Sequence, residues 1–159
     1  MACPGSRSPI RPIFNKATPC GLDWNELLPG DHCDYVMGNP PFIGQYLMSD
    51  SQKEDMRLIW DKGYDGYLDY ATGWHRKASE YLAKPGAAFA FVSTNSISQG
   101  QPVPSLFRPL FDEGWRIRFA HRTFAWDAQS TDNAHVHVVI VGMDKNVGTG
   151  ADPVRIHGH

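Results

Sequence analysis

The chain has 159 residues, a length typical of one domain. Hydrophobic residues make up 42% and charged residues 20%, a composition that supports a packed core and excludes wholesale disorder. The formal net charge is −2, whereas a stand-alone DNA-binding module carries a basic excess that neutralises phosphates. Any contact with nucleic acid is therefore expected to be local or to depend on another segment.

Cysteine content and hydropathy indicate the cellular compartment in which the protein is expected. Cys3, Cys20 and Cys33 are odd in number and none has Cys-x-x-Cys spacing, so neither a disulfide framework nor a zinc site is expected. No run approaches the roughly 18 apolar residues of a membrane helix. The basic residues near the N-terminus are not followed by the apolar region of a secretory signal. We expect a protein of the reducing cytoplasm that has no membrane partner.

The first elements lie before residue 62. Residues 1–19 are rich in proline, glycine and serine and predict a flexible arm. The short apolar stretch from Tyr35 to Met37 predicts a buried strand that stops at Asn39. Residues 50–61 carry apolar residues at helical spacing, with Asp50 or Ser51 as the expected N-cap.

A second helix and a second strand follow. Residues 68–83 place their aromatic and aliphatic residues largely on one helical stripe, and Asp69 is expected near the N-terminal end, where the helix dipole favours an acid. The continuous apolar run 87–93 predicts a strand that is covered on both faces, as in a parallel sheet.

The last part of the chain predicts a short helix at 103–113 and two strands at 116–120 and 136–141. This order of strands and helices indicates an α/β sheet. Residues 20–145 are therefore expected to form one domain, and residues 146–159 a flexible tail.

The tetrapeptide Asn39-Pro40-Pro41-Phe42 follows a predicted strand directly and suits chemistry on an exocyclic amine. The amine of adenine is a poor nucleophile because its lone pair is conjugated into the ring. An amide oxygen from Asn39 and the Pro40 carbonyl, held by a rigid Pro-Pro turn, could both accept hydrogen bonds from that amine and favour a pyramidal nitrogen. Phe42 then offers a face on which a base can stack.

The expected place of the tetrapeptide supports this interpretation, because ligands bind at the carboxyl ends of strands in open α/β sheets. The same residues are also a good turn by composition alone. Stacking on one ring is worth roughly 1–3 kcal/mol, whereas extruding a base from a duplex costs about a few kcal/mol. A second aromatic face is therefore expected, with Phe124 as the first candidate and Trp126 in reserve.

Several segments together resemble a known family. The stretch around Asn39 resembles motif IV of amino methyltransferases, and later segments resemble further motifs of the large single-chain type II restriction–modification enzymes that fuse an endonuclease to an adenine-N6 methyltransferase. The segments, which span roughly residues 21–143, are DYVMGNPPF, YLDYATGWHRKASEYL, AAFAFVSTNSISQG, IRFAHRTFAW and HVHVVIVG. The resemblance implies a doubly wound, Rossmann-like sheet, S-adenosylmethionine as methyl donor, double-stranded DNA as partner and a flipped adenine between Phe42 and Phe124.

The chain also departs from that family's pattern. The glycine-rich cofactor loop and the ribose-binding acid normally lie upstream of motif IV, and the 38 residues before Asn39 contain neither. These 159 residues are also not expected to contain the target-recognition region or the endonuclease segment of that family. Asp23 lies where these enzymes often carry an acid near the cofactor adenine, although an Asp there could equally cap the turn that leads into Asn25. We expect the C-terminal part of a catalytic domain, inactive by itself.

Four other features have plainer interpretations. His135 and His137 share a strand face, but no third metal ligand accompanies them and the expected reaction needs no metal. Residues 93–96 suit a hydrogen-bonded loop better than a wall of the active site. Arg116, Arg118 and Arg122 are spaced to form a small basic strip, either a solvated strand face or a phosphate contact. Trp60 and Trp74 lie on helical stripes and are expected in the core.

Two other functions stay open. Asn-Pro-Pro-aromatic motifs also serve enzymes that methylate RNA or a protein glutamine, and the chain could be a non-catalytic remnant or binding module that retains the fold. If the strand that ends at Asn39 lacks its outer neighbours, unpaired backbone groups and bare apolar surface would remain. We therefore expect either an upstream half as partner or self-association.

Overall fold

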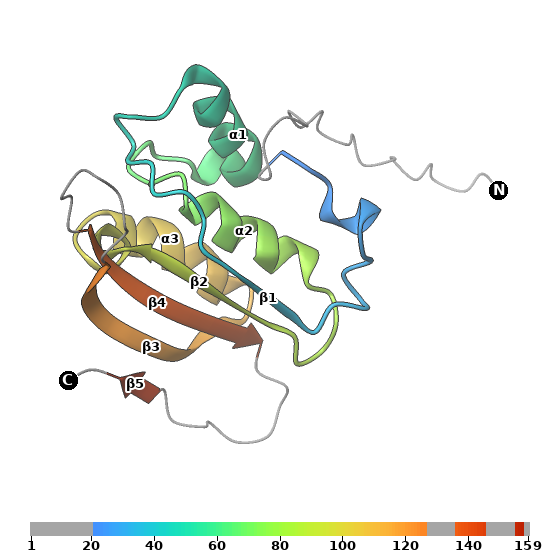
Figure 1. Cartoon of the computed structure of the whole chain (residues 1–159). Helices are drawn as coiled ribbons and strands as arrows, with labels where there is room; N and C mark the ends of the chain where they lie inside the picture. Colours follow the sequence, from blue (N-terminus) through green and yellow to red (C-terminus); the bar gives the residue numbers. More distant parts are fainter. Residues whose placement is uncertain (1–20, 127–135, 146–154, 158–159) are drawn as a thin grey trace.

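The computed structural model describes residues 21–126, 136–145 and 155–157 as one layer of helices against one twisted sheet (Figure 1). The helices lie together on one side of the strands. The elements in chain order are η1 (Trp24–Glu26), β1 (Tyr35–Gly38), α1 (Asp50–Trp60), η2 (Asp61–Gly63), α2 (Thr72–Tyr81), β2 (Ala88–Thr94), η3 (Asn95–Ser98), α3 (Pro102–Asp112), β3 (Trp115–Trp126), β4 (Val136–Lys145) and β5 (Arg155–His157).

The sheet has the strand order β1-β2-β4-β3-β5. β1 and β2 are parallel, with Gly38 opposite Phe91, and β4 runs antiparallel to both β2 and β3. Because β1 and β2 are parallel, their carboxyl ends meet at one edge of the sheet. β3 also ends at this edge, since Thr94 and Phe124 both lie opposite Val138. This mixed α/β sheet agrees with the fold class expected from the sequence.

α1 begins at a capping box. Ser49 accepts a hydrogen bond from Gln52 N at 3.3 Å, and the Gln52 side chain accepts one from Ser49 N at 2.9 Å. The two bonds satisfy backbone groups that the first turn leaves unpaired. The expected N-cap, Asp50 or Ser51, was therefore wrong by one or two positions, because three consecutive residues are all of the capping type.

α2 begins at Thr72, four residues later than expected. Thr72 donates both its backbone N–H and its hydroxyl to the Asp69 carbonyl, at 2.9 and 2.7 Å, which forms a tight turn before the helix. Asp69 thus lies in this turn, and its carboxylate does not cap the first turn of α2. Asp69 lies near the N-terminal end of α2, as expected, and its carboxylate accepts hydrogen bonds from the hydroxyls of Thr94 and Ser96.

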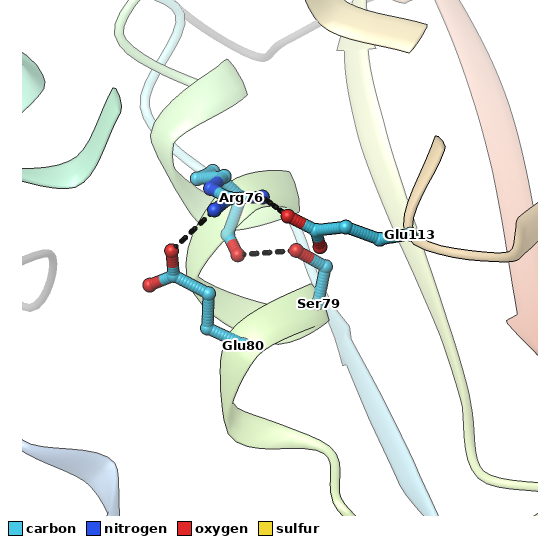
Figure 2. A network of polar contacts seen from close by, with 4 residues as sticks. All are labelled: Arg76, Ser79, Glu80 and Glu113. Carbon is cyan, nitrogen blue, oxygen red and sulfur yellow. Dashed lines mark hydrogen bonds and ion pairs between the residues drawn. The ribbon is translucent and has the colours of Figure 1, made fainter. Parts of the chain in front are cut away.

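A polar network holds α2 against the end of α3 (Figure 2). Arg76 pairs with Glu80 at 2.7 Å and with Glu113, and the Ser79 hydroxyl donates to the Arg76 carbonyl at 2.6 Å. Burial raises the pKa of the Glu80 carboxyl, and the Arg76 charge opposes that change. These contacts orient the two helices that cover the sheet.

One face of β2 carries most of the core. Phe89 and Phe91 are each 2% exposed and point toward the helices, while Ala88 and Ala90 on the opposite face are half-buried. Phe119 covers part of that second face by lying over Gly142. The expectation that this strand is covered on both faces was wrong for the described residues, because none of their helices lies on the Ala88 side.

β3 continues past the predicted strand end at Ala120 and reaches Trp126. Its pairing with β4 shifts twice, between Ile117 and Phe119 and between His121 and Phe124. These irregularities interrupt the alternation of apolar and polar residues along β3. The alternation that predicts a strand at 116–120 therefore does not continue into residues 121–126. Phe124 therefore lies within β3 and not in a loop after it.

Residues 155–157, expected to belong to a flexible tail, form β5 and pair parallel with β3. The expected arm at 1–19 and the rest of the tail lie outside the described residues. Within residues 21–126, 136–145 and 155–157, no helix is long and apolar enough to cross a membrane.

Candidate active site

Asn39-Pro40-Pro41-Phe42 follows β1 directly, as the sequence predicts. Asn39 and Pro41 are exposed, Pro40 is buried and Phe42 is half-buried. Ile43 N donates to the Pro41 carbonyl at 3.1 Å, which closes a three-residue turn around Phe42. Within residues 21–126 and 136–145, no group forms a hydrogen bond with the Asn39 side chain. Its amide is therefore available to a ligand.

A hollow of about 420 Å³ opens beside the tetrapeptide. Asn39, Pro40 and Pro41 line one side of it, and Trp24 and Trp74 are among its other lining residues. Neither Phe42 nor Phe124 lines this hollow. Trp74 was expected to be a core residue, and its 9% exposure confirms that, yet its ring also borders the hollow.

The segment that carries Trp24 is held against α2. The Lys77 ammonium donates to the Leu22 carbonyl and lies 5.5 Å from the Trp24 ring centroid. The Trp24 and Tyr81 rings meet edge to face at 5.5 Å, and Tyr81 donates its hydroxyl to the Leu28 carbonyl at 2.7 Å. α2 therefore fixes one wall of the hollow.

Asp23 caps η1 at its N-terminus. Its Oδ1 accepts from Asn25 N at 3.0 Å and from Asn25 Nδ2 at 3.2 Å. Asp23 borders a different, smaller hollow of about 140 Å³, together with Lys77 and Tyr81. The capping alternative is thus observed, while the expected contact of Asp23 with the cofactor stays a prediction.

The loop after the tetrapeptide is anchored to the core through Tyr70. Tyr70 N donates to the Ile43 carbonyl at 2.9 Å. The Tyr70 side chain is 2% exposed and donates its hydroxyl to Asp55 Oδ2 at 2.9 Å, beneath α1. This anchor lies within the segment that resembles a family motif, but its residues received no site role from the sequence.

Residues 93–96 were expected to form a hydrogen-bonded loop, but Ser93 and Thr94 end β2 and residues 95–96 begin η3. Asp69 Oδ2 accepts from the hydroxyls of Thr94, at 2.8 Å, and Ser96. Ser93 is fully buried, and its hydroxyl has no hydrogen-bond partner among the described residues. Asp69 was missed as a site residue because its partners lie 25 and 27 residues away along the chain.

Phe124 lies at the same sheet edge as the tetrapeptide but three strands away. With about 4.8 Å between neighbouring strands, the β1 and β3 backbones are roughly 14 Å apart. Phe124 is half-buried, and Thr123 beside it donates to Asn95 Oδ1. The structure therefore places Phe124 at the expected edge and not against Phe42. The side chain of the reserve candidate, Trp126, lies outside the described residues.

Two of the three arginines of the expected basic strip pair with the same acid. Asp144 is 4% exposed and accepts from Arg116 at 2.8 Å and from Arg118 at 3.2 Å. Arg122 is exposed. Of the histidine pair, His137 is exposed and His135 lies outside the described residues, among which no cluster of three or more His, Cys, Asp or Glu could hold a metal ion.

α2 also carries a histidine that no feature of the sequence pointed out. His75 is wholly buried, and its ring lies 6.0 Å from Phe89 and 5.1 Å from Phe91, centroid to centroid. Burial lowers the pKa of His75 to about 4, which a hydrogen bond with the Ala71 carbonyl opposes. His75 is therefore neutral at pH 7 and belongs to the core.

Comparison with known proteins gives the family. Residues 13–152 match the family described as MmeI, DNA-methyltransferase domain. This match extends beyond the domain expected from the sequence, residues 20–145, at both ends. The chain is 40% identical over 125 residues to DNA methyltransferase A of Bacillus subtilis (strain 168), covering 77% of this chain and 14% of that protein.

Two solved structures are similar to this chain. The type IIL restriction-modification enzyme MmeI, solved in complex with DNA, matches with a TM-score of 0.74 and 36% identity over 80% of this chain and 18% of that one. A putative class I S-adenosylmethionine-dependent methyltransferase from Listeria monocytogenes matches with a TM-score of 0.53 and 12% identity over 77% of this chain and 35% of that one. The second likeness concerns the fold alone, and confirms the expected partial Rossmann-like methyltransferase sheet.

The chain thus spans less than a fifth of the length of the curated relative and of MmeI. The family match nevertheless includes every described strand except β5 and the whole Asn39–Phe42 turn. The chain belongs to the family of MmeI DNA-methyltransferase domains.

Proposed function

We propose that this chain is the part of a DNA adenine-N6 methyltransferase, within a cytoplasmic restriction–modification system, that receives the target base. The observation that carries the proposal is the exposed Asn39 amide, held at the carboxyl end of β1 beside an apolar hollow. Membership of a DNA-methyltransferase family supports it.

The side chain of Asn39 and the backbone of Pro40 act on the amine of a flipped adenine. The amide oxygen of Asn39 and the carbonyl oxygen of Pro40 accept hydrogen bonds from its two N–H groups. The nitrogen therefore becomes pyramidal, and its lone pair is directed at the methyl group of the donor. The buried Pro40 ring and the Ile43–Pro41 hydrogen bond hold both acceptors without reorganisation. As the nitrogen–methyl bond forms, the methyl–sulfur bond breaks and its electron pair stays on the sulfur, which leaves as a neutral thioether. The amine then carries one proton too many and releases it to solvent.

Two rings stack on the flipped base. Phe42 is the nearer face, because it follows the two acceptors directly. Phe124 provides the opposite face from β3. Since stacking contributes roughly 1–3 kcal/mol per ring, two rings offset the few kcal/mol that extrusion of a base costs, whereas one ring offsets only part.

S-adenosylmethionine, the methyl-donor substrate, supplies an electrophilic methyl group on a positively charged sulfur. The indoles of Trp24 and Trp74 make the hollow beside Asn39 suitable for its flat adenine ring. Asp23, on the same segment as Trp24, is the candidate acid near that end of the donor.

Activity requires a further segment. β1 forms one edge of the sheet among the described residues, and its side chains Tyr35 and Met37 are 68% and 76% exposed. Exposed apolar residues on an unpaired strand are the mark of an interface. We therefore propose that an upstream half adds strands beside β1 and completes the donor site, and that the 159-residue chain alone transfers no methyl group.

A chimera tests this proposal. The 125 aligned residues of the Bacillus subtilis relative are replaced by the corresponding residues of this chain. The chimera is expected to transfer labelled methyl groups from S-adenosylmethionine to duplex DNA, and nucleoside mass spectrometry is expected to find N6-methyladenine. Asn39→Ala is expected to lower the rate roughly 100-fold, as loss of one preorganised polar group does. Glu54→Gln, at an exposed position on α1, is the matched control.

The calorimetric titration of the 159-residue chain with S-adenosylmethionine completes the test. Absence of heat is expected, because the donor site is incomplete. A chimera that binds the donor but methylates cytosine, RNA or a protein glutamine would contradict the adenine assignment. A chimera that binds both donor and DNA, yet transfers nothing, would favour a non-catalytic module.

A further inference from the structure

One acidic side chain joins two loops at the active-site edge of the sheet. Asp69 lies in the turn before α2 and is half-buried. Its Oδ2 accepts from Thr94 Oγ1 at 2.8 Å and from the Ser96 hydroxyl. Thr94 is the last residue of β2 and Ser96 lies in η3, at the start of the connection between β2 and α3. A carboxylate is a pure acceptor, and hydrogen bonds to an ionised oxygen are stronger than those between neutral groups.

The same turn holds the loop after the Asn39–Phe42 tetrapeptide. Tyr70 N, adjacent to Asp69, donates to the Ile43 carbonyl at 2.9 Å. A Cβ placed on Gly44 would lie 3.8 Å from Asp69 Oδ1, so the second carboxylate oxygen faces this loop at ordinary contact distance. The Asp69–Tyr70 pair therefore touches both loops at once.

The contacts continue from the β2 loop to β3. Asn95, between Thr94 and Ser96, accepts hydrogen bonds at Oδ1 from Ser98, at 2.8 Å, and from Thr123. Thr123 immediately precedes Phe124. Polar contacts thus run from the loop beside Phe42, through Asp69, to the strand that carries the second proposed ring.

We propose that Asp69 is a positioning residue that sets the separation between the two walls of the target-base pocket. The proposal rests on the proposed function, since it concerns the pocket between Phe42 and Phe124. A base stacked between two rings needs ring planes about 7 Å apart, twice an aromatic contact distance. Phe42 follows β1 and Phe124 lies in β3, so their spacing depends on the contacts between these segments. Asp69 joins the loop after Phe42 to Thr94 and Ser96, on either side of the Asn95 that contacts β3.

Spin-label distances in the full chain test this role without DNA or methyl donor. Labels are placed at Leu47 and Gln99, exposed positions on the two loops, after Cys3 and Cys20 are replaced by serine and Cys33 by alanine. Labelled protein is diluted in unlabelled protein, so that only distances within one molecule contribute. The Leu47–Gln99 distance distribution of the otherwise native chain is expected to be narrow.

Asp69→Ala is expected to broaden that distribution roughly twofold, because local contacts open without global unfolding. Asp69→Asn is expected to restore the narrow distribution, since one amide oxygen can accept both hydroxyls. A control pair at Glu54 and Asp112, exposed on α1 and α3, is expected not to change.

A second pair of substitutions keeps the test decisive if Asp69→Ala fails to fold. Thr94→Val with Ser96→Ala removes the same two donors while it leaves Asp69 in place, and the same broadening is expected. An unchanged distribution in both cases, or equal broadening of the control pair, would overturn the proposal. Because no ligand is present, this result is independent of whether the chimera methylates DNA.

Discussion

Acidification is expected to destabilise the chain through one buried histidine. His75 on α2 is 0% exposed and packs against Phe89 and Phe91. Its Nδ1 lies 3.4 Å from the Ala71 carbonyl oxygen, and its Nε2 has no hydrogen-bond partner among the described residues. A positive charge on this ring would face an apolar environment, so burial lowers the pKa of His75 from 6.5 to about 4.

The sign of the effect follows from proton linkage. Between pH 6.5 and about 4, the unfolded chain binds a proton at this position and the folded chain does not. The free energy of unfolding therefore rises with pH across this window, and stability is lost as pH falls through 6.5. The full pKa difference corresponds to about 3 kcal/mol, and about 2 kcal/mol of it is lost by pH 5.

Urea denaturation at pH 7.5 and pH 5.0 measures this loss, with His75→Phe as the comparison. Phe fills the same site beside Phe89 and Phe91 but does not titrate. The native chain is expected to lose about 2 kcal/mol more than the variant between the two pH values. Equal losses in both proteins, or a His75 ring that titrates near pH 6.5 in the folded state by NMR, would refute this account.

Three further predictions concern packing and surface. Gly142→Ala places a methyl group 2.1 Å from a Phe119 ring atom and is expected to cost about 1–3 kcal/mol in urea denaturation. Met37→Lys, at a position 76% exposed, is expected to reduce self-association in sedimentation velocity and to change stability by no more than about 0.5 kcal/mol. Asp144→Ala removes the buried acceptor of Arg116 and is expected to cost about 1–2 kcal/mol, whereas an unchanged urea midpoint would contradict that role.

Much of the fold could be predicted from local patterns. The strand at Tyr35–Gly38 is short, apolar and ended by two prolines, so its limits follow from the residues themselves. Its expected burial was wrong, because β1 lies at the edge of the described sheet and Tyr35 and Met37 are exposed. α1 and α3 were also placed to within a residue or two, because their apolar residues recur at helical spacing. These elements depend on their own sequence more than on their neighbours.

The remaining features depend on contacts between distant segments. α2 starts at Thr72 because the Asp69 carbonyl accepts two bonds from it, which no helical pattern reveals. β3 continues through residues 121–126 because β4 pairs with it across two irregularities. Within the site, the tetrapeptide at Asn39 could be found from its chemistry. Asp69 could not, since a single acid in a turn carries no signal until Thr94 and Ser96 are folded beside it.

The distribution of charge is expected to separate the proposed methyl transfer from DNA affinity. The tetrapeptide at Asn39 is uncharged, and the net charge of the whole sequence is −2. On β3, Asp144 pairs with Arg116 and Arg118, while Arg118 and Arg122 are both exposed. A protein that neutralises few phosphates loses little affinity for DNA as the salt concentration rises.

The 159-residue chain is therefore expected to bind duplex DNA weakly, with a shallow salt dependence in fluorescence anisotropy. The chimera retains the relative's remaining surface and is expected to bind tightly, with a steep salt dependence. A steep dependence for the chain alone would mean that residues of this chain supply the phosphate contacts, and the division between chemistry here and affinity elsewhere would be wrong.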